Sequence, residues 1–146
     1  MADTSKVLAV CISEKKGVVK HAVESIEVND KGIIGDAHSG DWHRQISLLS
    51  VDSVNKVQSK IEFKLKPGAF AENILTDTGI VLYELKIGQK IKVGECILVV
   101  TQIGKECHAS CEIRKITGDC VMPREGIFTK VITGGKIKAG DEIELI

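Results

Sequence analysis

Glycines divide the second half of the chain into short apolar runs, and this pattern limits the possible folds more than any other feature. Residues 85–104, LKIGQKIKVGECILVVTQIG, indicate two or three short strands. Residues 126–146, GIFTKVITGGKIKAGDEIELI, indicate a hairpin-like pair with turns at 134–135 or 139–141. Short strands joined by glycine turns are typical of closed antiparallel sheets rather than of alternating strand–helix layers. The pattern therefore predicts a mainly β protein built on a barrel-like closed sheet.

The first half of the chain predicts further strands and little helix. The runs at 6–13 and 45–49 indicate strands, and an alternating segment leads to a turn at 29–32. After the second run, Ser50 or Asp52 is placed to cap a short helix with Val54, Val57 and Ile61 on one face. We expect one or two short helices and a single domain over residues 1–146, a length that suffices for one hydrophobic core.

The charge balance and the apolar runs argue against nucleic-acid and membrane partners. The chain has 20 basic and 20 acidic residues and no long basic run, whereas nucleic-acid-binding surfaces are basic. No segment approaches the roughly 20 apolar residues that span a bilayer. The N-terminal run also lacks the pattern of a signal peptide. We therefore expect a cytoplasmic protein whose five cysteines stay as thiols, thiolates or metal ligands.

The five cysteines divide into two groups by their surroundings. Cys11 and Cys96 lie in the apolar runs LAVCIS and GECILVV, where cysteine packs as a small hydrophobe. The other three lie in a polar stretch whose cationic neighbours would lower a thiol pKa and favour the reactive thiolate. These cysteines and neighbours are Cys107, Cys111, Cys120, Lys105, His108, Arg114 and Arg124.

A zinc site is an alternative for the same stretch. Cys107, Cys111 and Cys120, with His108 or His43, would supply four ligands, although zinc sites more often carry paired Cys-x2-Cys motifs. A thioredoxin-type redox pair is disfavoured because the Cys-x3-Cys spacing is one residue too long. A zinc-stabilised or thiol-rich binding module without catalysis therefore stays open.

Two further polar clusters interrupt apolar runs upstream. The first cluster contains Asp36, His38 and Arg44, within residues 35–49 (GDAHSGDWHRQISLL). These side chains could bind a ligand or form a solvated loop. The second cluster contains Glu72 and Asn73, which follow a Pro-Gly turn within residues 68–75 (GAFAENIL). Polar groups in such an apolar run need hydrogen-bond partners. No phosphate-binding glycine loop and no nucleophile elbow is present in the sequence.

Taken together, these blocks resemble the MOSC domain, the C-terminal domain of molybdenum-cofactor sulfurases. The similar segments are 32–49, 66–75, 85–107 and 126–145, so the resemblance covers roughly residues 6–146. The motifs GKECHxxCxI and GDCxMPREGIF resemble the compact, stand-alone branch related to domains fused to a MogA-type molybdopterin adenylyltransferase. The resemblance implies a distorted closed β-barrel, related to the small domain of pyruvate kinase.

The resemblance also implies a molybdenum cofactor, a Mo-pyranopterin, and the residues that would hold it. One cysteine would act as a thiolate ligand of the metal or carry sulfur as a persulfide. Cys107 is the first choice for this role and for the metal ligand, and Cys111 is the competitor. A soft thiolate suits molybdenum, and cations suit the cofactor's phosphate. The residues implied for cofactor binding are Asp36, His38, Arg44, Asn73, Lys105 and Arg124.

Three functions follow from the sequence as hypotheses. The first is a cofactor-binding or sulfur-carrier protein that works with a sulfur donor and with cofactor biosynthesis or acceptor proteins. The second is a molybdenum-dependent reductase of N-hydroxylated compounds, which would need an electron-donor protein because the sequence has no flavin or iron–sulfur motif. The third is the zinc- or thiol-stabilised binding module without catalysis.

Overall fold

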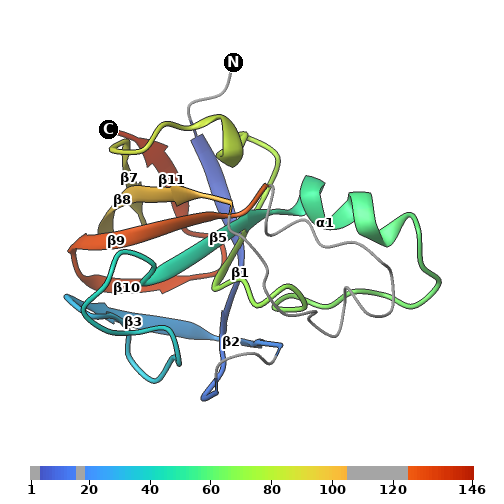
Figure 1. The fold of residues 1–146 in the computed structure, drawn as a ribbon, viewed down its shortest axis with the longest axis horizontal. Helices are drawn as coiled ribbons and strands as arrows, with labels where there is room; N and C mark the ends of the chain where they lie inside the picture. The colour runs from blue at the N-terminus through green and yellow to red at the C-terminus, as the bar shows by residue number, and fades with distance from the viewer. Residues whose placement is uncertain (1–3, 16–18, 105–124) are drawn as a thin grey trace.

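The computed structural model describes residues 4–15, 19–104 and 125–146, and its main element is a closed β-barrel (Figure 1). The strands of the main sheet are β1 (Thr4–Ile12), β2 (His21–Val23), β5 (Ile46–Ser50), β6 (Ile74–Thr76), β7 (Lys90–Val93), β8 (Cys96–Ile103), β9 (Ile127–Thr133) and β11 (Glu142–Leu145). They are hydrogen-bonded in the order β11–β7–β8–β9–β5–β6–β1–β2, and β1 also pairs with β11, which closes a seven-stranded ring. The predicted mainly β fold with a closed barrel is confirmed.

Strand β1 holds the barrel together because it pairs with three partners along its length. Its first residues pair with β11, with Ser5 opposite Ile143. Its middle pairs with β6, where a register shift falls between Val7 and Ala9, and its end pairs with β2. An irregularity of this kind bends a strand, as closure of a small barrel requires.

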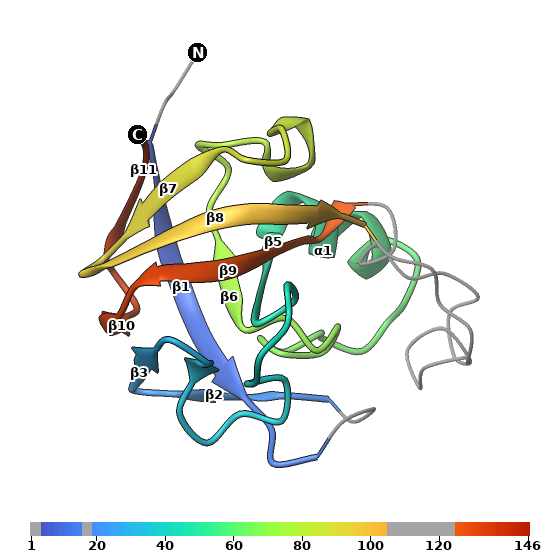
Figure 2. The same cartoon turned by 60° about the vertical axis from the view of Figure 1, so that its left-hand side comes forward.

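A smaller antiparallel sheet lies at one end of the barrel (Figure 2). It consists of β10 (Gly135–Lys138), β3 (Ser25–Asn29) and β4 (Gly32–Ile33), in the order β10–β3–β4. The expected turn after β3 is present, and Asn29 pairs with Gly32 across it. The tail turns at residues 139–140, one of the two expected places, but the predicted hairpin is wrong: β9 pairs with β5 and β8, β10 with β3, and β11 with β1 and β7.

Two helical elements lie with both ends in the described residues: the α-helix α1 (Val51–Gln58) and a 3-10 turn, η1 (Leu82–Glu84). Of the two predicted caps of α1, Ser50 and Asp52, the structure uses Ser50, whose hydroxyl accepts the N–H of Asp52 at 3.2 Å. The helix ends before Ile61, which packs beyond it. In the chain α1 lies between β5 and β6. These two strands form a parallel pair, which the sequence did not predict. No helix in the described segments is long and apolar enough to cross a membrane.

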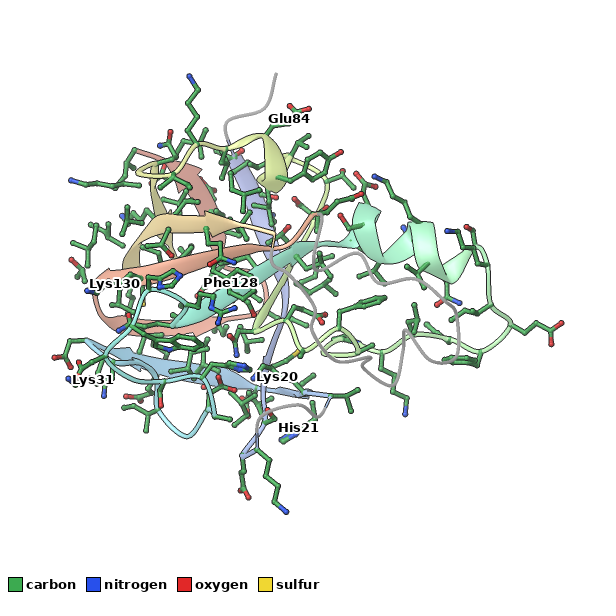
Figure 3. All side chains as sticks on the ribbon, in the orientation of Figure 1. Lys20, His21, Lys31, Glu84, Phe128 and Lys130 are labelled. Atoms are coloured by element: carbon green, nitrogen blue, oxygen red, sulfur yellow. The ribbon has the colours of Figure 1, made fainter. Side chains whose placement is uncertain are left out.

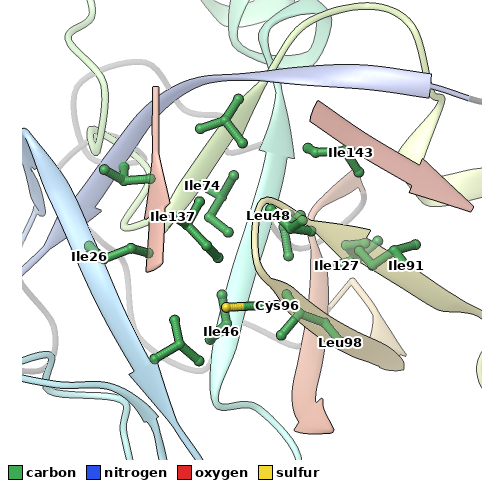
Figure 4. Packing of buried hydrophobic residues seen from close by; sticks show 14 of the residues in the cluster. Ile26, Ile46, Leu48, Ile74, Ile91, Cys96, Leu98, Ile127, Ile137 and Ile143 are labelled. Atoms are coloured by element: carbon green, nitrogen blue, oxygen red, sulfur yellow. The ribbon is translucent and has the colours of Figure 1, made fainter. Parts of the chain in front are cut away.

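The barrel interior is filled by aliphatic side chains (Figure 4). Its fully buried members include Ile46, Leu48, Ile91 and Ile143, and Cys96 lies among them. A second cluster packs beneath α1 and is made of Leu49, Val57, Leu65, Phe70 and Phe128. The chain has only five aromatic residues, and its core is accordingly built mainly from Val, Ile and Leu.

Candidate functional site

A buried ion pair joins Lys20, just before β2, to Asp36, in the loop after β4 (Figure 3). The Lys20 Nζ lies 2.7 Å from the Asp36 Oδ1, and both side chains are 0% exposed. The same carboxylate accepts the backbone N–H of Ser13 on Oδ1 and that of His38 on Oδ2, each at 3.1 Å. Asp36 therefore connects the segment after β1 to the loop that carries His38.

The hydrogen bonds to Asp36 decide its charge. Burial alone would raise the pKa of the Asp36 carboxyl, because an apolar environment disfavours the charged form. The hydrogen bond from Lys20 and the backbone N–H groups of Ser13 and His38 outweigh burial, and the pKa falls below its ordinary value. Asp36 is consequently a carboxylate at neutral pH.

Aromatic rings pack against residues 38–44, the part of the loop that follows Asp36. The Trp42 indole N–H donates to the carbonyl of His38 at 2.8 Å, and the two rings stack with centroids 6.3 Å apart. The Arg44 Cζ lies 4.7 Å from the centroid of the Trp42 ring and 5.7 Å from that of Phe128, which comes from β9 (Figure 3). Guanidinium groups stack favourably on aromatic faces, so these rings orient Arg44.

Arg44 lines a small pocket at this position. The lining residues are His38, Arg44, Ser47, Phe70, Ala71, Asn73 and Phe128. The free volume is about 20 Å³, room for about one water-sized group. The Arg44 Nε is buried and has no hydrogen-bond partner within the described structure. Because an unsatisfied buried donor costs about 1–3 kcal/mol, this side chain favours a ligand that brings an acceptor atom.

Asn73 also lines the pocket, and its side-chain amide forms hydrogen bonds within the protein. Its Oδ1 accepts the backbone N–H of Ser47 at 3.0 Å and the Ser47 hydroxyl at 3.2 Å. Its Nδ2 donates to the carbonyl of Cys11 at 3.1 Å. The amide thus links β5 to β1, and it contributes to the pocket mainly by fixing Ser47.

Glu72 organises the loop that borders the pocket. Its carboxyl oxygens accept the backbone N–H groups of Gly68 at 2.8 Å and Phe70 at 3.0 Å. Burial raises the pKa of Glu72, although these N–H groups and Lys20 oppose the shift. The chain makes a tight turn here, with Ala71 at φ 63°, and this turn places Phe70 and Ala71 beside Arg44.

Two polar residues of the segment 35–49, His43 and Asp41, do not line the pocket. His43 is exposed, and its Nε2 lies 2.9 Å from the Oε1 of Gln102. Asp41 is exposed and pairs with Lys31. In the described part of the chain, no group of three His, Cys, Asp or Glu side chains is arranged to hold a metal ion.

The structure buries two of the five cysteines, as the sequence predicts. Burial raises the pKa of the Cys11 thiol to about 12 and that of Cys96 to about 11, and nearby carboxylates add to both shifts. Both thiols stay protonated and act as packing groups. The other predicted residues, Cys107, Cys111, Lys105 and Arg124, lie outside the described residues, as does Cys120.

The structure brings together the four predicted residues that it describes. His38, Arg44 and Asn73 line one pocket, and Asp36 stands behind His38. Sequence reasoning missed Lys20, which has no local signal because its importance depends on partners far along the chain. It also missed Trp42 and Phe128, two of only five aromatic residues, whose rarity was the one available signal.

Comparison of the fold with solved structures gives several matches over almost the whole chain. The YuaD protein from Bacillus subtilis matches with a TM-score of 0.81 and 22% identity, covering 97% of this chain and 95% of that one. YiiM from Geobacillus stearothermophilus matches with a TM-score of 0.74 and 16% identity, covering 97% and 75%. YiiM from Escherichia coli gives 0.68 and 19%, covering 97% and 69%. At these identities the matches show a shared fold.

The family of the chain follows from its sequence rather than from the fold matches. A search among curated proteins gave no match. The family model of the MOSC domain matches residues 35–144, a range that holds the Asp36 loop, the pocket residues and the closing strand β11. The chain belongs to the MOSC domain family.

Proposed function

We propose that the pocket at Arg44 is part of a binding site for the molybdenum cofactor, in a protein that holds this cofactor or carries sulfur for it. MOSC domains are typically linked to molybdenum-cofactor-related proteins, which motivates this choice of ligand. The observation that carries the proposal is the Arg44 side chain, which aromatic rings orient and whose buried Nε finds no acceptor among the residues that the structure describes. A phosphate oxygen is such an acceptor, and arginine suits its geometry.

The residues present fit one anionic group of the cofactor. The pocket has a free volume of about 20 Å³, which accommodates one oxygen-sized atom and not a pterin ring system. In this proposal Arg44 donates to a phosphate oxygen, and Asn73 holds Ser47 at the pocket wall. Lys105 and Arg124 remain proposed as further cations, and Cys107, with Cys111 as competitor, as the thiolate. The bound cofactor would supply molybdenum for redox or sulfur chemistry.

The proposal includes partners of a stated kind. In this proposal the sulfur comes from a donor protein. The recipients would be cofactor biosynthesis or acceptor proteins of the cytoplasm. A reductase acting on N-hydroxylated compounds would instead draw electrons from a partner protein.

Cofactor loading tests the proposal. The purified protein is incubated with molybdenum cofactor released from a donor enzyme, separated from excess ligand, and assayed for molybdenum by metal analysis and for pterin by fluorescence. We expect both in about equal amounts in the wild type. Arg44→Gln should lower retention at least about tenfold, the effect of losing a charge-assisted hydrogen bond worth 1.5–3 kcal/mol.

Matched variants separate the outcomes. His43→Gln, an exposed neighbour outside the pocket lining, should retain cofactor like the wild type. Cys107→Ser and Cys111→Ser should differ, with the larger loss identifying the thiolate. Absence of both molybdenum and pterin from the wild type would reject the proposal. One equivalent of zinc with unfolding on chelation would support the zinc-stabilised module in its place.

A further inference from the structure

The ammonium group of Lys20 contacts three polar neighbours. The side chain is 0% exposed, and its Nζ lies 2.7 Å from the Asp36 Oδ1 and 3.2 Å from the Ser13 Oγ. Its third neighbour is the His38 Nδ1, at 3.0 Å. An ammonium group has three N–H donors and no acceptor, so each of these contacts has the lysine as donor.

This contact fixes the protonation of His38. A nitrogen that accepts a hydrogen bond carries no proton, so the Nδ1 of His38 is bare and the neutral ring holds its proton on Nε2. The competing arrangement, an imidazolium that donates from Nδ1 to Asp36, fits the distances less well. The Asp36 Oδ2 lies 3.8 Å from that nitrogen and already accepts the backbone N–H of His38.

We propose that Lys20 is a positioning residue that holds His38 as the neutral Nε2–H tautomer at the wall of the Arg44 pocket. The inference concerns the free protein and needs no ligand. Its consequence for recognition rests on the proposed function: with His38 neutral, Arg44 is the charged group among the described lining residues, and a guanidinium favours acceptor atoms, such as the oxygens of a phosphate, over a cationic ligand.

The charges around His38 point the same way. Among the described residues, those that face it are Lys20 at its Nδ1, Asp36 behind it, and Arg44 in the shared pocket lining. Two cations and one anion disfavour a further positive charge on the ring. Removing Lys20 would leave Asp36 as the nearest charge and favour the imidazolium.

Imidazole nitrogen NMR tests this inference directly. Long-range 1H–15N correlations of 15N-labelled protein are recorded over a pH series, and the His38 signals are assigned by their loss in His38→Gln. In the wild type near neutral pH we expect an unprotonated Nδ1 and a protonated Nε2. In Lys20→Met the midpoint of His38 protonation should rise by at least about one pH unit, the usual effect of one neighbouring charge.

Control measurements keep the result interpretable. Ser13→Ala removes one acceptor of Lys20 and leaves the contact with His38, so it should leave the His38 midpoint within about half a unit of wild type. If Lys20→Met does not fold, Lys20→Met/Asp36→Asn removes both charges of the pair. In that variant the midpoint should still lie above that of the wild type, because the lysine that donates to Nδ1 is gone.

The wild-type spectrum alone can overturn the inference. A proton on Nδ1, or an imidazolium at neutral pH, would refute it in any background. An unchanged midpoint in a folded Lys20→Met protein would also refute it, because a purely structural lysine would not move that readout. Failure of the wild type to retain cofactor, with the expected tautomer present, would reject only the proposed function.

Discussion

At the residue scale, burial decides which sulfur atoms can react. With pKa values raised to about 12 and about 11, Cys11 and Cys96 are almost entirely protonated near neutral pH. We expect both to be labelled by a thiol reagent far more slowly than an unfolded cysteine, with a rate that increases as pH rises towards those values. Peptide mapping after timed labelling measures this.

The same labelling in denaturant is the control, since all five thiols should then react. Fast native labelling of Cys11 or Cys96 would contradict the burial seen in the structure. Any cysteine that does react quickly in the native protein becomes the first target for the sulfur-transfer assay.

Gly68 is a second residue whose chemistry is fixed by its surroundings. Its φ is +91°, and a Cβ added there would overlap the carbonyl oxygen of Lys20. Gly68→Ala should lower the free energy of unfolding by at least about 2 kcal/mol, from backbone strain and from displacement of Lys20. Denaturant titration measures the loss, and the pocket should lose cofactor affinity with it.

Gly88→Ala is the matched control for this substitution. Gly88 has a similar φ of +96° but nothing within 4 Å of the added atom. It should therefore lose only about 1 kcal/mol, from strain alone. Equal losses for the two variants would show that contact with Lys20 is not what requires glycine at Gly68.

The predicted site residues also show where sequence reasoning stops at this scale. Asp36, His38, Arg44 and Asn73 were expected from the family resemblance, and the structure places them together. The sequence could not reveal that the Asn73 amide is hydrogen-bonded inside the protein while the Arg44 Nε has no partner in the described segments. Hydrogen-bond partners are set by tertiary contacts, and the partners of Asn73, which are Ser47 and Cys11, lie far from it in the chain.

At the element scale, the start of α1 depends on one hydroxyl. Ser50 caps the helix through the N–H of Asp52. Ser50→Ala should lower the free energy of unfolding by about 1 kcal/mol, the usual cost of a lost cap. Thermal and denaturant unfolding measure it. Ser59→Ala, an exposed position after the helix, should cost less than about 0.5 kcal/mol, and a larger effect there would contradict the capping argument.

The elements were predicted to different degrees for physical reasons. The start of α1 was foreseen because a cap is a local signal, read from Ser50 and its neighbours. The parallel pairing of β5 with β6 was not, since its register, with Leu48 opposite Ile74, joins distant segments. Strands and turns were visible in the sequence as apolar runs and glycines, whereas the order of strands around the barrel was set by packing.

At the scale of the whole molecule, closure of the barrel depends on the side chains of its last strand. Ile143 in β11 is fully buried opposite Ser5 of β1. Ile143→Ala should reduce the free energy of unfolding by about 2–5 kcal/mol through lost burial and a cavity. Ile132→Ala, in β9 but 50% exposed, should change it by less than about 1 kcal/mol. Similar losses would mean that the barrel seam is not tightly packed.

The pairing of β1 with β11 has a consequence for how the barrel forms during synthesis. Residues 4–6 leave the ribosome well before their partners, residues 142–144. Until those residues emerge, the nascent chain carries an open strand edge, which invites pairing with other chains. The ring can close only after β11 has left the ribosome, so a chaperone that shields strand edges would act before that stage.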